Sequence, residues 1–147
     1  MSIQTIRSII AFAILIHGLA HGRAFFSLLR DAAGAGKTIP VRFWLASSLT
    51  PRVQALLASV FWGLSTLGFI GAALSFWGVL LPAEWWRPLV ITGALISLLG
   101  SALFSGIWPG APTRRMSTAD TVISLLFNAA ILFGLLLLNW PPAAYNP

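Results

Sequence analysis

Three long stretches of the chain carry no charged residue, namely residues 53–83, 88–113 and 121–147. Each is longer than the ~20 apolar residues that an α-helix needs to cross a bilayer core of about 30 Å. They predict transmembrane helices over residues 53–81, 87–108 and 118–140.

The first apolar segment is less uniform, because His17, His21 and Arg23 interrupt it. We place this helix at residues 6–29. With it, the pattern predicts an all-α fold: a polytopic membrane protein that forms a four-transmembrane-helix bundle as a single domain over residues 1–147.

The expected connections contain residues that end helices or suit a membrane surface. The longest connection is residues 30–52, in which residues 41–45 suit a short interfacial helix. Pro51 suits the first turn of the second helix, because a helix start leaves that N–H unpaired anyway. Indole side chains prefer the head-group region, and six fall near predicted helix ends: Trp44, Trp77, Trp85, Trp86, Trp108 and Trp140.

The composition agrees with a membrane protein. Of 147 residues, 58% are hydrophobic and 8% are charged, whereas about 25% of residues are charged in an average soluble domain. The formal net charge is +6, but the basic residues are scattered, so no nucleic-acid surface is predicted. The lack of cysteine excludes thiol nucleophiles and thiolate metal sites.

The distribution of basic residues predicts an orientation. Seven of them lie in or beside the loops that follow the first and third predicted helices, whereas Arg7 and Arg87 lie on the opposite side. Since basic residues favour the cytoplasmic side, we expect the N-terminus and the C-terminus outside and the loop at residues 30–52 in the cytoplasm.

The strongest chemical signal is a pair of histidines in the first helix. Four-residue spacing puts His17 and His21 on one helix face, and ionisable groups inside a membrane are often functional. One interpretation is that both are neutral and belong to a buried polar layer, with partners at similar depth on the other helices: Thr66, Ser97 and Asn128.

Three functional uses of His17 and His21 also stay open: a transition-metal pair, axial ligation of haem, or a proton relay. Two nitrogens alone are too few for a stable metal site, so we predict no metal. A haem held by two histidines would need a second copy of the chain or another subunit, because adjacent turns of one helix cannot supply both axial ligands.

Small residues recur at four-residue spacing and let helix backbones approach closely in a membrane. They predict packing seams, within the bundle or between copies, at Gly68 and Gly71 of the second helix and at Gly93, Ser97, Ser101 and Ser105 of the third.

Several of these features occur together in one order along the chain: HGxxH at residues 17–21, the pair Trp85-Trp86, Ser97, and Trp108 with Ala111. In this order the chain resembles a group of small bacterial four-helix integral membrane proteins that are broadly DoxX-like. It departs from them at Asn128, which comes later after Trp108 than their asparagine does. The resemblance implies a fold and a bacterial inner membrane, and no activity.

Together these observations predict a non-enzymatic integral membrane protein, either an accessory subunit or a self-associating bundle. Its expected partners are the lipid bilayer and further copies or a larger membrane complex. No cofactor is predicted. The first alternative is a membrane cofactor-binding protein, haem or quinone-linked, that uses His17 or His21. The second is a small transporter, which is weaker because no acidic residue lies deep within a predicted span.

Overall fold

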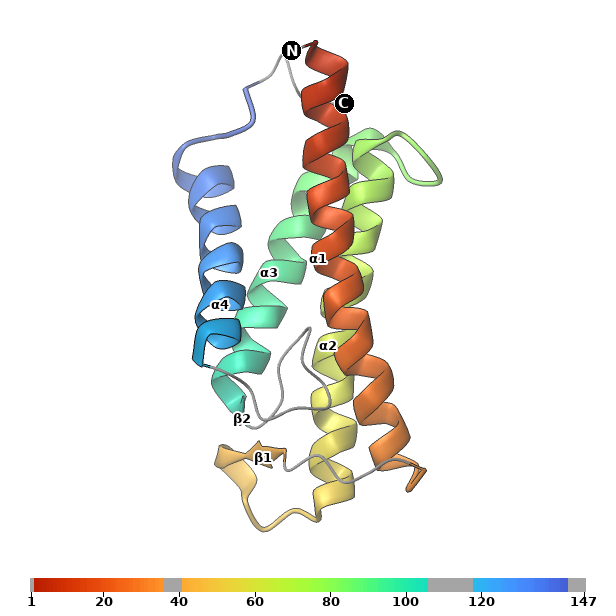
Figure 1. Cartoon of the computed structure of the whole chain (residues 1–147), viewed down its shortest axis with the longest axis vertical. Helices are drawn as coiled ribbons and strands as arrows, with labels where there is room; N and C mark the ends of the chain where they lie inside the picture. Colours follow the sequence, from red (N-terminus) through yellow and green to blue (C-terminus); the bar gives the residue numbers. More distant parts are fainter. Residues whose placement is uncertain (1, 36–40, 106–117, 143–147) are drawn as a thin grey trace.

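The computed structural model describes residues 2–35, 41–105 and 118–142, and of residues 118–121 the backbone alone. Four helices form a bundle (Figure 1), which confirms the predicted helical fold. They are α1 (Ile3–Ala32), α2 (Pro51–Phe76), α3 (Trp86–Leu103) and α4 (Thr118–Leu132), and α4 continues as the π-helical turn η3 (Phe133–Leu137).

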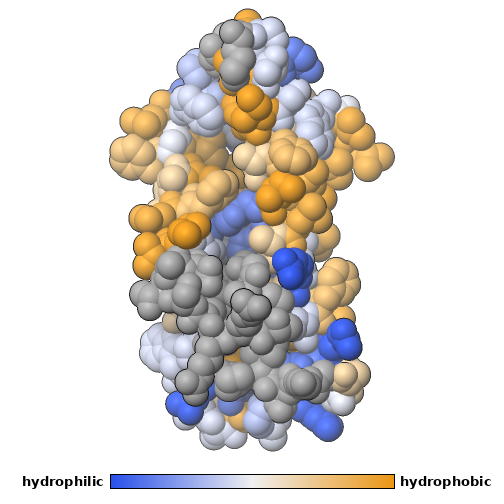
Figure 2. Space-filling model, in the orientation of Figure 1, coloured by the Kyte–Doolittle hydropathy of each residue, from blue (hydrophilic) through white to orange (hydrophobic). Residues whose placement is uncertain are grey.

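Three of the helical segments are long and apolar enough to cross a membrane: Ile3–Ala32, Pro51–Phe76 and Ala83–Leu103, the last including the 3-10 turn η2 (Ala83–Trp85). The fourth apolar segment, Val122–Leu137, is shorter. Figure 2 shows hydrophobic residues around the middle of the molecule and more hydrophilic ones at both ends. This distribution is the one expected of a multi-pass membrane protein.

Three helices end earlier than the sequence predicts: α2 and α3 by five residues each, and α4 with η3 at residue 137 and not 140. Helix α2 stops at Phe76, not at residue 81, because Gly78 and Leu80 adopt positive φ angles of 69° and 67° and turn the chain away from the helix axis. The Ser75 hydroxyl donates to the carbonyl of Pro82 and holds this turn against the helix end. Helix α3 stops at Leu103, not at residue 108, because Phe104 is extended.

The extended residues after α3 close one end of the bundle. Strand β2 (Phe104–Ser105) pairs antiparallel with β1 (Arg42–Phe43). The interfacial helix expected at residues 41–45 is therefore replaced by β1 and the 3-10 turn η1 (Trp44–Ala46). The side chain of Gln54 fixes this loop, since its Oε1 accepts from the Phe43 N–H at 2.6 Å.

Helices α2 and α3 pack backbone against backbone at two glycines. A Cβ added to Gly68 would lie 2.9 Å from Gly93 Cα and 3.0 Å from the carbonyl oxygen of Leu89, so the two backbones touch there. The Ser65 hydroxyl donates to the Gly93 carbonyl at 3.0 Å across the same contact. A Cβ on Gly71 would meet the Leu89 side chain at 3.3 Å.

The predicted seam on the third helix holds only in part. Gly93 and Ser97 are buried and Ser101 is half-buried on α3, whereas Ser105 is exposed in β2. The inclusion of Ser105 in the helical row was wrong, because the helix has already ended and the four-residue spacing no longer places it on that face.

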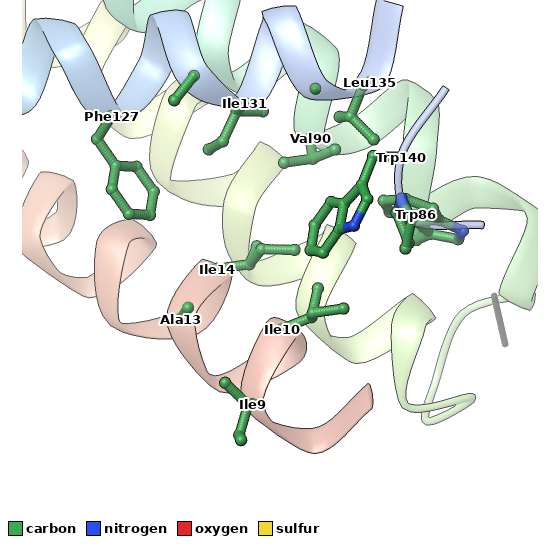
Figure 3. A pocket seen from close by; sticks show the side chains of 13 residues that line it. Ile9, Ile10, Ala13, Ile14, Trp86, Val90, Phe127, Ile131, Leu135 and Trp140 are labelled. Atoms are coloured by element: carbon green, nitrogen blue, oxygen red, sulfur yellow. The ribbon is translucent and has the colours of Figure 1, made fainter. Parts of the chain in front are cut away.

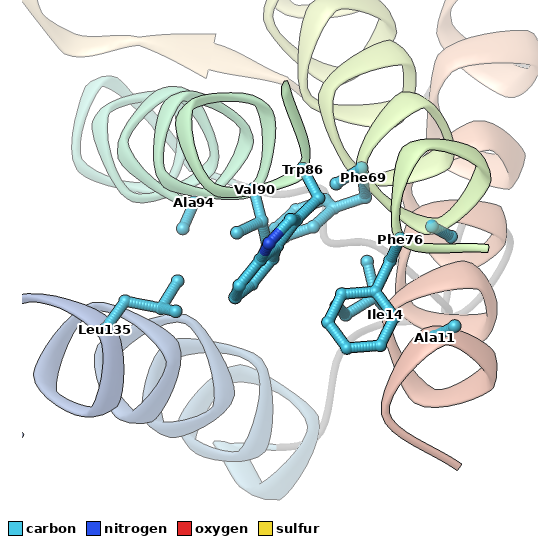
Figure 4. Packing of buried hydrophobic residues seen from close by; sticks show 10 residues of the cluster. Ala11, Ile14, Phe69, Phe76, Trp86, Val90, Ala94 and Leu135 are labelled. Atoms are coloured by element: carbon cyan, nitrogen blue, oxygen red, sulfur yellow. The ribbon is translucent and has the colours of Figure 1, made fainter. Parts of the chain in front are cut away.

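Helix α4 packs more lightly than the other three. Among its described side chains and those of η3, only Ser124, Asn128 and Leu135 are buried. Figure 4 shows Leu135 reaching from α4 toward Val90 and Trp86 of α3, with Phe76 and Ile14 beyond them. A second apolar cluster, around Trp62, Leu28 and Phe104, fills the β1–β2 half of the bundle.

Candidate functional site

Four polar side chains from three helices meet between these two apolar clusters, and we call them the polar network: His17 and His21 of α1, Ser97 of α3 and Asn128 of α4. The two histidine Nε2 atoms lie 3.1 Å apart. His17 Nε2 lies 3.3 Å from Asn128 Oδ1, and His21 Nε2 lies 3.4 Å from Ser97 Oγ. Asn128 Nδ2 donates to Ser97 Oγ at 3.1 Å and closes the ring.

Donor and acceptor chemistry favours one arrangement of the protons in this ring. Because an amide oxygen only accepts, His17 donates from Nε2 to Asn128. The Nε2 of His21 then accepts from the Ser97 hydroxyl, and its 3.1 Å contact with His17 shares the one Nε2 proton that also goes to Asn128. Asn128 uses its second N–H on the Ser124 carbonyl at 2.9 Å. All four side chains are thus joined in their neutral forms, without a carboxylate or a thiol.

One polar atom at the site is left over. If Nε2 of His21 accepts, its ring proton is on Nδ1, and this buried nitrogen has no hydrogen-bond partner in the described part of the chain. A buried donor without a partner is costly. At this position a ligand could add a bond without breaking another.

Aromatic rings enclose the two histidines. Phe127 of α4 stacks on His17 with ring centroids 4.3 Å apart, and Phe69 of α2 meets the same ring edge-on at 4.7 Å. The His21 ring stacks between Phe69 at 5.4 Å and Trp62 at 5.6 Å. His21, Ser97 and Asn128 have 0%, 0% and 1% of their surface exposed. The hydrogen bonds therefore lie in a low-dielectric interior, where they are electrostatically stronger than in water.

Two glycines bring the histidines into this interior. Gly18 and Gly22 each follow a histidine, and both face α2. A Cβ on Gly18 would lie 2.8 Å from Phe69 Cβ, and one on Gly22 would lie 3.4 Å from Thr66 Cγ2. Because glycine has no side chain, this face of α1 can approach α2 closely. Each histidine precedes its glycine by one residue, so its side chain points to a neighbouring face of α1 and reaches toward α3 and α4. The sequence analysis noted the HGxxH motif but did not predict that its glycines pack against α2.

The residues predicted from the sequence to form a polar layer do not all lie together. Ser97 and Asn128 lie in the polar network with both histidines, whereas Thr66 does not, because its hydroxyl donates to the Trp62 carbonyl of its own helix at 2.7 Å. The flanking rings of Phe69 and Phe127 were not predicted.

The described residues contain no group of three or more His, Cys, Asp or Glu side chains placed to hold a metal ion. Comparison of the chain with family models, curated proteins and solved structures found no match. The geometry of the polar network is thus the basis for any functional proposal.

We expect His17 and Asn128 to be energetically coupled. A double-mutant cycle of His17→Ala and Asn128→Ala, measured by reversible unfolding in detergent, should give a coupling free energy of about 0.6 kcal/mol, within an upper bound of about 1.7 kcal/mol. The control cycle combines His17→Ala with Ser65→Ala, a buried serine that bonds Gly93 and not the polar network. Coupling in the control cycle but none between His17 and Asn128 would contradict the assignment.

Proposed function

We propose that the chain is a non-enzymatic integral membrane protein, an accessory subunit or a self-associating bundle, whose polar network fixes α4 against the other helices. The closed ring of hydrogen bonds is the observation that carries this proposal. Its four side chains are neutral, mutually bonded and enclosed by aromatic rings. Such a site holds helices together: it contains no carboxylate or thiol, and its one hydroxyl, that of Ser97, is fully buried.

The energetics support a positioning role. Interhelical hydrogen bonds in membranes contribute about 0.6 kcal/mol each, so the two bonds that Asn128 makes to His17 and Ser97 stabilise the bundle by only about 1 kcal/mol. The free-energy cost of misplacing α4 is larger, because any other rotation of α4 leaves His17, Ser97 and Asn128 unpaired in an apolar interior. Since apolar packing of α4 is light, this polar contact selects its position.

A second candidate function is cofactor binding, haem or quinone-linked, and the unpartnered Nδ1 of His21 favours it. A quinone carbonyl oxygen at this nitrogen would complete the hydrogen-bonding capacity of His21, whereas ligation of haem iron would require the nitrogen without its proton. Ligation through either Nε2 is less favourable, since those atoms face each other at 3.1 Å and ligation would break the ring.

Purification separates the two candidates. We expect the wild-type protein in detergent to be colourless and free of stoichiometric metal, and native mass spectrometry to detect self-association or a copurifying chain. The comparison variant is His17→Ala with His21→Ala. A Soret band, a bound quinone or a stoichiometric metal that the wild type carries and this variant loses would replace the first proposal with the second.

We also propose that the chain lies in a bacterial inner membrane with both termini outside. Exposed arginines at the β1–β2 end support this orientation, namely Arg30, Arg42 and Arg52, while Arg7 and Arg87 lie toward the other end of the bundle.

Reporter fusions test this orientation. Alkaline phosphatase fused to the C-terminus should be active and green fluorescent protein at the same position dark, because phosphatase folds in the oxidising periplasm. Fusions at the exposed loop residue Ser47 serve as the control and should give the reverse. An active phosphatase at Ser47 with a fluorescent C-terminal fusion would invert the orientation.

A further inference from the structure

An apolar cavity of about 320 Å³ lies between α1 and α4. Figure 3 shows its wall of aliphatic side chains, with Ile10 and Ile14 from α1, Val90 from α3, and Ile131 from α4. The backbones of α1 and α4 come close at few points, which leaves this space between them. No side chain in the lining apart from the two indole N–H groups offers a hydrogen bond, so the lining suits a hydrocarbon chain.

The cavity opens to the surface that faces lipid. Three of its lining residues are well exposed, Ile9 by 53%, Phe127 by 37% and Trp140 by 47%. Figure 3 shows Trp86 and Trp140 at one end of the cavity and Phe127 at the other. Because indoles favour the head-group level, the tryptophan end lies near the membrane surface and the Phe127 end lies deeper.

An unpaired cation lies beside the tryptophan end. The guanidinium carbon of Arg87 is 5.7 Å from the centre of the Trp86 ring, which lines the cavity. Its Nε and Nη2 atoms are buried and have no hydrogen-bond partner among the described residues. These two atoms form one edge of the guanidinium, with parallel N–H bonds that match two oxygens of a phosphate. Arginine stays charged, so a buried unpaired edge is costly and calls for an anion.

We propose that this cavity and Arg87 bind one anionic phospholipid, with an acyl chain between α1 and α4 and the phosphate on the Nε–Nη2 edge of Arg87. The apolar lining, the lateral opening and the free guanidinium edge each match one part of such a molecule. Phe127 lines the cavity and stacks on His17, so it lies between the end of the acyl chain and the histidine. The lipid site is therefore distinct from the polar network.

Native mass spectrometry of the detergent-purified protein tests the site, with phosphatidylglycerol and diacylglycerol of identical chains as probes. We expect one phosphatidylglycerol per chain, bound at least about tenfold more tightly than diacylglycerol, since a charge-assisted pair of hydrogen bonds exceeds the 1.4 kcal/mol of a tenfold change. Arg87→Gln should abolish this preference. Arg23→Gln, which removes an exposed arginine from a different helix, α1, should preserve the preference for phosphatidylglycerol.

A second variant tests the chain-binding part separately. A Cβ on Gly134, which lines the cavity, meets no atom within 4 Å, so Gly134→Leu should fold and fill the space, and weaken both lipids about tenfold or more. Ala129→Leu places the same leucine side chain on an exposed face outside the lining and is the matched control. Equal binding of the two lipids to wild type, an unchanged preference in Arg87→Gln, or unchanged binding in Gly134→Leu would overturn the proposal.

Discussion

A polar side chain inside a bilayer must find its hydrogen-bond partners within the protein, because no water is there to replace them. His17 and Asn128 meet this constraint by bonding across the space between α1 and α4. Ser97 links both to α3. In our proposal this one set of contacts selects how α4 is rotated and how deep it lies.

The bundle therefore has two kinds of helix contact. Between α1, α2 and α3 the backbones approach at glycines, with Gly18 against Phe69 and Gly68 against Gly93, and dispersion over many close atoms provides the stabilisation. Between α1 and α4 the contact is a polar one at mid-height, and the apolar faces on one side of it remain apart. The cavity is the consequence, and a lipid chain there would supply the packing that α4 lacks.

The sequence predicted the four helices because charge is absent over spans that match the bilayer, a signal that needs no tertiary information. It did not predict where α2 and α3 end. Leu80 adopts a positive φ that its residue type disfavours, and Phe104 leaves α3 to pair with Phe43 on a strand far away in sequence. Both are set by neighbours in space.

The candidate site shows the same limit. Depth along a helix is readable from residue counts, and it places Thr66, Ser97 and Asn128 at one level. The rotation of a residue about the helix axis cannot be read from residue counts. This rotation separates Thr66, which bonds within α2, from Ser97 and Asn128. The unpaired edge of Arg87 also could not be predicted, because the sequence alone does not exclude an acidic partner.

The most direct measurement of the central claim is the distance between α1 and α4. The chain has no cysteine, so spin labels can be placed at two exposed positions, Leu19→Cys and Leu126→Cys, and compared by double electron–electron resonance with and without Asn128→Leu. If the polar network positions α4, the parent gives one narrow distance distribution and Asn128→Leu broadens or shifts it. The same narrow distribution in both proteins would contradict the account.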